Sequence, residues 1–308
     1  MHQYQLQRYS GVNSKHRCPN CRHRQKTFKL YINTQTNQPL NELVGLCDRL
    51  DKCGYHYTPK QYFAEKGIAY SDMRIAIRRP NIAIRNTPIS IPATIPNQIF
   101  TASLSRYGQN NLVEFLRLLF GDDTTQRLIE RYYIGTSKHW YGATVFWQVD
   151  LNKQVRTGKI MLYNATNAKR VKLPFNHITW VHTALKLPDF ELSQCLFGEH
   201  LLHDTTKPVA IVESEKTAII ASAYMPAYIW IATGGLSNLT PQKCSILKGR
   251  QVHLYPDLNA FDAWQAKANE LGLIANITLF PLLEQIANAQ HRTDGLDIAD
   301  YLMGLWPI

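Results

Sequence analysis

Residues 207–262, KPVAIVESEKTAIIASAYMPAYIWIATGGLSNLTPQKCSILKGRQVHLYPDLNAFD, decide the fold of the second half of the chain. Val209–Val212 is a short continuous apolar run, typical of a strand that is covered on both faces. Similar runs occupy residues 228–232 and 251–255, and helical spacing follows the first and the third run. Strands that alternate with helices predict βαβ units, so we expect an α/β fold with a parallel sheet.

Acidic residues follow two of these expected strands. Glu213 and Glu215 come directly after the first strand, and Asp257 comes after the third. In a parallel sheet the residues just past the carboxyl ends of the strands share one crevice, so Glu213 and Asp257 are expected to converge. Two carboxylates in one crevice repel unless a cation lies between them, and oxygen ligands suit Mg²⁺. The pattern therefore predicts a divalent metal site.

These acids and the turn Gly234-Gly235 resemble the toprim domain of DNA primases and type IA topoisomerases. That family has a glutamate after its first strand, a glycine turn after the second and an Asp-x-Asp motif after the third. The resemblance implies that Glu213 is the acid/base glutamate, Glu215 a supporting acid and Asp257 the first aspartate of the metal pair. Asn259 stands where the second aspartate is expected, and an amide binds Mg²⁺ more weakly than a carboxylate.

A second acidic segment lies near the end of the chain. Residues 294–302, DGLDIADYL, resemble the segment that closes many primase-type toprim domains. Asp297 and Asp300 lie three residues apart, on one face if the segment is helical. The resemblance implies a magnesium or manganese site formed by Asp257, Asn259, Asp297 and Asp300, in which the last two supply the missing negative charge.

The N-terminal part of the chain carries a predicted zinc site. Cys18-Pro19-Asn20-Cys21 is a CxxC motif, and a second pair follows at Cys47 and Cys53. Between the pairs, residues 27–32 alternate between polar and apolar, as a hairpin strand does. Four thiolates in this arrangement predict a structural zinc ion in a β-ribbon. The wider spacing of the second pair leaves His56 as a substitute ligand.

Length, composition and charge limit the classes of function that the protein can have. The chain has 308 residues, 45% hydrophobic and 19% charged, which predicts more than one folded domain. Its net charge of +11 favours a polyanionic partner. Residues 1–85 hold 15 basic and 5 acidic residues, and the remainder holds 19 and 18, so we expect the nucleic-acid contact in the N-terminal third. The polar start and the lack of a long apolar run predict a cytoplasmic protein with no membrane partner.

The sequence divides into four predicted parts. They are a zinc-ribbon domain at 1–67, a proline-rich linker at 68–100, a mixed α+β subdomain at 101–204 and a toprim domain at 205–308. In the mixed subdomain we expect a helix at 111–133 that breaks at Gly121, followed by a strand-turn-strand over residues 143–163. We expect four aromatic residues of this region to be buried in its core: Trp140, Tyr141, Trp147 and Trp180.

The mixed subdomain also carries basic residues. Primases have a similar strand-turn-strand before toprim, with basic residues that face template and nucleotide. The resemblance gives this role to Arg156, Lys159, Arg170 and Lys172, and a solvated hairpin face is the alternative. Lys216, just after the glutamate pair, is expected to neutralise Glu213, to contact a phosphate, or simply to lie on a helix surface.

The resemblance implies a primase-like nucleotidyltransferase of a replication or mobile-element system. Such a protein binds single-stranded DNA, joins ribonucleotides from nucleoside triphosphates with Mg²⁺ or Mn²⁺, and works with a helicase or another replication protein. Asn259 favours an alternative, a DNA-binding protein that keeps the toprim fold with reduced catalysis. A toprim nuclease or topoisomerase is the third reading, and the chain offers no convincing tyrosine for it.

Overall fold

The computed structural model describes residues 3–8, 14–49, 53–66 and 92–304. The chain divides into two compact units, Met1–Pro88 and Ile89–Ile308. Most of the predicted linker, residues 68–91, lies outside the described residues.

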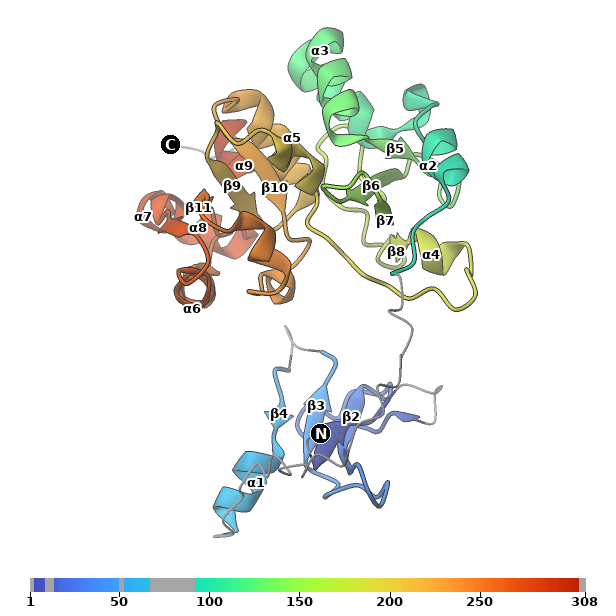
Figure 1. The fold of residues 1–308 in the computed structure, drawn as a ribbon, viewed down its shortest axis with the longest axis vertical. Coiled ribbons are helices and arrows are strands. Elements are labelled where there is room, and N and C mark those ends of the chain that lie inside the picture. The colour runs from blue at the N-terminus through green and yellow to red at the C-terminus, as the bar shows by residue number, and fades with distance from the viewer. Residues whose placement is uncertain (1–2, 9–13, 50–52, 67–91, 305–308) are drawn as a thin grey trace, which may run out of the picture. The chain divides into compact units, whose positions relative to one another are not determined.

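The first unit is built on a small antiparallel sheet (Figure 1). Its strands have the order β1-β2-β3-β4 and are listed here with the helix that follows them: β1 (Tyr4–Leu6), β2 (Phe28–Asn33), β3 (Gly45–Cys47), β4 (His56–Tyr57) and α1 (Pro59–Glu65). The hairpin strand predicted at residues 27–32 is confirmed. Along β2, Phe28, Leu30 and Ile32 point into a core that also contains Cys18 and Cys47.

The second unit begins with an antiparallel sheet whose order is β5-β6-β7-β8. Its elements are α2 (Asn97–Ser103), η2 (Tyr107–Gln109), α3 (Asn111–Tyr132), β5 (Gly135–Thr136), β6 (Thr144–Val149), β7 (Val155–Met161), β8 (Ile178–Trp180), α4 (Val181–Ala184) and η3 (Glu199–His203). The backbone of α3 leaves helical geometry at Gly121, where φ is 76°. A positive φ suits glycine, so the predicted break is confirmed.

A parallel sheet of order β10-β9-β11-β12 completes the second unit. Its elements are β9 (Val209–Val212), α5 (Glu215–Tyr224), β10 (Ile229–Ala232), η4 (Leu236–Asn238), η5 (Lys243–Leu247), β11 (Gln251–Leu254), α6 (Phe261–Leu271), β12 (Asn276–Leu279), α7 (Leu282–Ile286), α8 (Ala289–Asp294) and α9 (Ile298–Leu302). The α/β class and the parallel sheet are confirmed. Because β10 and β11 lie on opposite sides of β9, the strand order reverses at β9, and crevices for ligands form at such reversals.

The two sheets of the second unit lie next to each other and share one hydrophobic core (Figure 1). That core takes Phe146 from β6, Trp230 from β10 and Ala299 from α9. Tyr132, at the end of α3, donates its hydroxyl to the carbonyl of Trp230 at 3.0 Å. The boundary expected between residues 204 and 205 thus falls between two sheets that are packed together.

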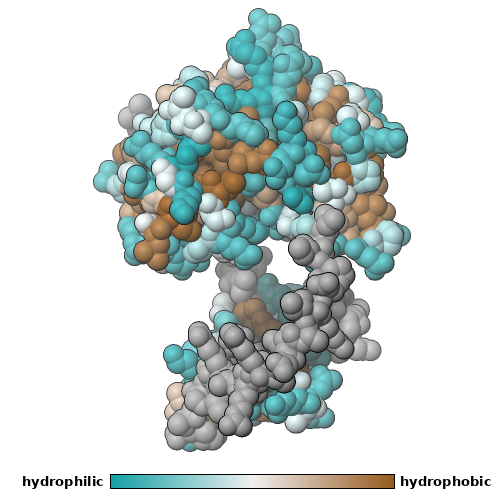
Figure 2. All heavy atoms as spheres, in the orientation of Figure 1, coloured by the Kyte–Doolittle hydropathy of each residue, from teal (hydrophilic) through white to brown (hydrophobic). Residues whose placement is uncertain are grey.

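The surface of the second unit is mostly polar, with hydrophobic residues that reach it in separate places (Figure 2). The exposure of one aromatic residue corrects the sequence analysis. Trp147 is buried as expected, but the side chain of Tyr141 is 81% exposed, so its assignment to the core was wrong. No helix in the described ranges is long and apolar enough to cross a membrane.

Candidate functional site

The first candidate site is the group of four cysteines in the first unit. The sulfur atoms of Cys18, Cys21, Cys47 and Cys53 all lie within 4.8 Å of one another. Cys18 and Cys53 are separated by 3.7 Å between their sulfurs. Four thiolates at about 2.3 Å from one zinc ion have sulfurs about 3.8 Å apart, so the geometry fits tetrahedral zinc. The cysteines support a structural zinc site, as predicted.

The surroundings of these sulfurs differ, and they favour the thiolate at Cys53 but not at Cys18. Burial raises the pKa of the Cys18 thiol to about 12, whereas the backbone amide of Tyr55 is the main cause that lowers the pKa of Cys53 to about 6. Arg49 donates to the sulfur of Cys21 at 3.7 Å. His56 is placed differently, because its Nε2 pairs with the Tyr31 hydroxyl at 3.0 Å and it is absent from the metal-binding group.

The second candidate site is a cavity of about 570 Å³ in the second unit. Its acidic lining residues are Glu213, Glu215, Asp257, Asp294, Asp297 and Asp300. Its basic lining residues are Lys159, Lys169, Arg170, Lys172 and Lys216. The cavity lies at the carboxyl edge of the parallel sheet because Glu213 follows β9, Asp257 follows β11, and these strands are neighbours. The structure thus brings to one cavity acids that are far apart in the sequence.

Asp297 is fixed in the cavity wall by hydrogen bonds. Its Oδ1 accepts the backbone N–H groups of Ala299 at 2.8 Å and Asp300 at 3.1 Å, which makes it the N-cap of α9. Its Oδ2 accepts the hydroxyl of Thr217 from α5 at 2.6 Å. Asp300 completes a capping box by accepting the N–H of Asp297 at 3.0 Å. The hydrogen bonds that cap α9 therefore also hold the carboxylates of Asp297 and Asp300 beside the cavity.

The carboxylates at the cavity repel one another. Burial first, and then the charges of Asp297, Glu213 and Asp300, raise the pKa of Asp257 well above its usual range, while Lys216 lowers it. Burial and Asp297 likewise raise the pKa of Asp300, against Lys216 and Lys169. A proton or a cation would relieve this crowding, and carboxylate oxygens are ligands that suit Mg²⁺. The chemistry of the donor set therefore fits a divalent cation.

The spacing of these carboxylates differs from that of the cysteines. In the part of the chain that the structure describes, the four cysteines are the one group of three or more His, Cys, Asp or Glu residues that is close enough together to hold an ion. The acids line the cavity at wider separations, so they form a charged wall and not a closed coordination shell.

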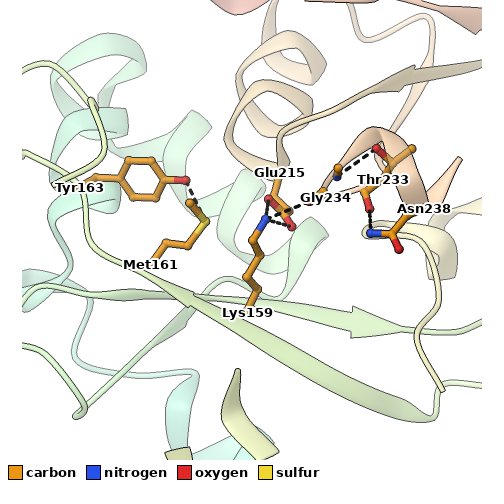
Figure 3. Close-up of polar contacts among 8 residues, drawn as sticks. Lys159, Met161, Tyr163, Glu215, Thr233, Gly234 and Asn238 are labelled. Carbon is orange, nitrogen blue, oxygen red and sulfur yellow. Dashed lines mark hydrogen bonds and ion pairs between the residues drawn. The ribbon is translucent and has the colours of Figure 1, made fainter. Parts of the chain in front are cut away.

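Glu215 and Lys159, which both line the cavity, form an ion pair (Figure 3). The Nζ of Lys159, on β7, lies 3.1 Å from both carboxylate oxygens of Glu215, at the start of α5. It also donates to the carbonyl of Gly234 at 3.4 Å. Gly234 has φ of 69°, and a Cβ there would lie 2.9 Å from Glu215 Oε1, so the turn after β10 needs glycine. The sequence analysis proposed both charged residues separately and missed that they pair.

Two predicted site residues lie outside the cavity lining. Arg156 binds Asp150 through Nε at 2.7 Å and Nη2 at 2.6 Å. Asn259 has a left-handed backbone, with φ of 67°, and donates its side-chain amide to the carbonyl of Arg292 at 2.8 Å. Its backbone N–H donates to Glu284 at 2.8 Å. Asn259 thus fastens the turn after β11 to the helices α7 and α8.

Residues that the sequence analysis did not single out also belong to the site. Thr217 holds Asp297, and Lys169 lines the cavity near Asp300. Lys169 directly precedes Arg170, so its position in the basic run was an available signal. Thr217 gives none, because a threonine inside a helix has no distinguishing pattern.

Two protein-family models match parts of the chain. Residues 2–68 match a family described as a zinc beta-ribbon finger, in agreement with the four cysteines. Residues 110–258 match a domain of unknown function, DUF6371, which runs from the start of α3 to just past Asp257. A search of curated proteins finds no match.

The chain is also similar to solved structures of primases. The primase fragment of the bacteriophage T7 primase-helicase protein is 15% identical, with 86% of this chain and 88% of that chain covered and a TM-score of 0.36. The E. coli primase catalytic core is 12% identical, with 68% and 81% covered and a TM-score of 0.40. The DnaG primase catalytic domain bound to single-stranded DNA is 12% identical, with 66% and 80% covered and a TM-score of 0.41.

Proposed function

We propose that the second unit is a toprim-type nucleotidyl-transfer site that acts on single-stranded DNA and joins ribonucleotides, as a primase does. One observation carries the proposal: acids from three separate segments line a single cavity together with five basic residues. Acids that bind a divalent cation, in the same cavity as basic groups that bind phosphates, are what phosphoryl and nucleotidyl transfer needs.

The residues have distinct proposed roles. Asp257 and Asp300, with Asp297 behind them, would hold Mg²⁺ or Mn²⁺, which when bound would neutralise charge on a triphosphate. Glu213, at the end of β9, would accept the proton of the attacking hydroxyl. Lys169, Arg170, Lys172 and Lys216 would contact phosphate oxygens. Glu215 is paired with Lys159, so we give it a positioning role.

The first unit has a separate proposed role. Its zinc ribbon is followed and surrounded by basic residues, and we propose that it contacts the DNA template. A helicase or another replication protein of a mobile element remains the proposed protein partner.

The decisive experiment measures incorporation of labelled ribonucleotides on a single-stranded template with Mg²⁺ or Mn²⁺. We expect oligomers from the wild-type protein, and a loss of at least a hundredfold in Glu213→Gln and in Asp257→Asn. Asp262→Asn is the matched control, because Asp262 is an exposed acid on α6 that does not line the cavity. Equal activity in all four proteins would contradict the proposed site.

The position of Asn259 favours a second candidate. Its amide is used to fasten a turn, so the place of a second metal-binding aspartate is filled by a structural residue. A DNA-binding protein with reduced catalysis would show template binding without product under either metal.

A further inference from the structure

A cluster of aromatic rings lies on the surface of the second unit, where Trp140 packs against the core of the antiparallel sheet. We call it the aromatic face and define it as the four rings in mutual contact, His139, Trp140, Phe175 and His177, together with the exposed Tyr141 that follows Trp140 in the sequence. Phe175 and His177 stack, with ring centroids 4.2 Å apart. Trp140 meets His177 edge-on at 5.1 Å and His139 at 4.5 Å. Two separate segments, before β6 and before β8, thus build a continuous set of four rings.

The outermost members of the face are unusually exposed for their size. The side chains of Tyr141 and Phe175 are 81% and 53% exposed, and the neighbouring Leu173 is 82% exposed. Exposing large apolar side chains to water is unfavourable. A group of them gathered at one place on a surface is typical of a binding site.

The face is held rigidly by the fold beneath it. Trp140 packs against the core of the antiparallel sheet, and its carbonyl accepts the N–H of Ala143 at 3.1 Å. Asn111, at the start of α3, donates its N–H to the carbonyl of Gly142 at 3.0 Å. On the other segment, the N–H of His177 donates to Val171 at 3.3 Å. A rigid platform loses little conformational entropy when a ligand stacks on it.

The charge around the face selects the ligand. Residues 131–188 contain nine Lys and Arg residues against a single acid, Asp150, which is paired with Arg156. Basic residues thus outnumber acidic ones in this region as well. The counts for residues 1–85 and for the remainder do not show this, because acids elsewhere in the remainder balance the charge. Lys138 and Lys172 flank the face in the sequence, and neither forms an ion pair among the described residues.

The face is also continuous with the proposed site. Lys169, Arg170 and Lys172 line the acid-walled cavity, and the same segment continues directly into Leu173 and Phe175. The cavity lining and the aromatic face are thus separated by only two residues along this segment.

We propose that the aromatic face binds unpaired bases of a single-stranded nucleic acid by stacking, while Lys138 and Lys172 contact its phosphates. Stacking on aromatic side chains inside a positively charged groove is how proteins hold single strands without reading their sequence. The inference rests on the proposed function in one respect, since both require a polynucleotide. A protein partner or a second copy of the chain would need apolar contact but would not explain the one-sided charge.

The test compares two fluorescent single strands that differ only in their bases: an oligothymidine and an abasic strand of equal length. With the full chain, we expect anisotropy titrations to give at least tenfold tighter binding of the oligothymidine, because the abasic strand offers no base that can stack on the rings. Tyr141→Ala and Phe175→Ala should each weaken oligothymidine binding by about fivefold or more and leave abasic binding unchanged. Tyr224→Ala, a matched exposed tyrosine on α5, should change neither.

Salt dependence separates the rings from the charges. Lys172→Gln should reduce the slope of log affinity against log salt by about one, because one phosphate contact is lost, whereas the ring variants should keep the wild-type slope. Equal binding of both strands by the wild type, no binding of either strand, or ring variants that bind like the wild type would each overturn the proposal. So would ring variants that change only the sedimentation behaviour, because the face would then be a protein contact.

The outcome is independent of the transfer reaction. Asp257→Asn should abolish incorporation and keep the preference for the oligothymidine. If the wild-type protein makes no product, and Tyr141→Ala loses the preference for the oligothymidine, the proposed function is refuted and the aromatic face is supported. If the wild-type protein makes product, and both ring variants bind the oligothymidine as the wild type does, the proposed function is supported and the aromatic face is refuted.

Discussion

The stability of the second unit depends on the buried ion pair between Lys159 and Glu215. Both side chains are largely shielded from water, and the lysine makes two contacts of 3.1 Å with the carboxylate. We expect Lys159→Met to lower the free energy of unfolding by about 3–5 kcal/mol, because a buried carboxylate would be left without a partner. Urea denaturation measures this loss.

Two further variants show whether the loss comes from the unpaired charge. Adding Glu215→Met to Lys159→Met should restore most of the stability, since two apolar side chains can replace a buried ion pair. Lys267→Met, which breaks an exposed pair with Glu270, should cost at most about 1 kcal/mol. Similar small losses in both single variants would mean that water reaches Glu215 and that the pair contributes little.

His200 provides a pH-dependent test at the same scale. Its Nε2 donates to the carbonyl of Arg131 at 2.9 Å, its Nδ1 is buried without a partner, and burial lowers the pKa of the ring. The unfolded state therefore takes up a proton first as the pH falls below about 6.5, so the stabilisation is complete above that pH and is lost below it. Comparing pH 7.5 with pH 5.5, this residue should account for a loss of up to about 1.4 kcal/mol.

His200→Gln should remove this dependence. The amide of glutamine can still donate to Arg131, but it does not titrate in this range. We expect a smaller difference in unfolding free energy between the two pH values in the variant than in the wild type. His182 and His253, whose pKa values burial also lowers, and Asp257, whose pKa burial raises, contribute a pH dependence that stays in both proteins. An equal difference in the two proteins would show that His200 is protonated without cost.

Among the secondary-structure elements, α3 depends on one buried cap. The Oδ1 of Asn110 accepts from Val113 N–H at 3.3 Å and from the Thr144 hydroxyl at 2.8 Å. Its Nδ2 donates to the carbonyl of Gly135 at 3.0 Å. Asn110→Ala should lower the unfolding free energy by about 3 kcal/mol, because the cap is lost and buried polar groups of two strands lose their partners. Thermal or urea unfolding measures the effect.

The helix cap at Asn288 is the control for that prediction. Asn288 starts α8 with a capping box but joins no strand, so Asn288→Ala should cost about 1 kcal/mol. Equal losses at the two caps would contradict the view that Asn110 fixes α3 to the antiparallel sheet.

The elements themselves could be predicted because their signals are local. Val209–Val212 is apolar throughout and is fully buried in a parallel strand, and Gly121 breaks α3 at the expected place. The pairing of Lys159 with Glu215 could not be predicted, since it depends on how two sheets pack. Tyr141 was placed in the core because aromatic residues usually bury, and sequence alone does not say which side of a short turn faces water. Glu213 and Asp257 could be expected at one edge of the sheet, because parallel strands end at the same edge whatever contacts their side chains make.

At the scale of the whole molecule, the two units depend on different sources of stability. The first unit has a core of five buried residues, two of them cysteines of the metal site, whereas the second unit has cores that extend through both of its sheets. A core as small as the first cannot offset the entropy of ordering the chain, so bound zinc should supply much of its folding free energy.

Removing zinc from the full chain should therefore unfold the first unit and leave the second intact. After chelation, we expect hydrogen exchange to lose protection in β1 to β4 and to keep it in β6, β7 and the strands of the parallel sheet, because a tetrahedral site closes the ends of the ribbon. Cys47→Ser should reproduce this pattern without a chelator. Cys244→Ser, at a buried cysteine of the second unit outside the metal site, should leave β1 to β4 protected. If chelation instead exposed the parallel sheet together with the ribbon, the two units would share one folding transition, and zinc would act on the cavity as well as on the cysteines.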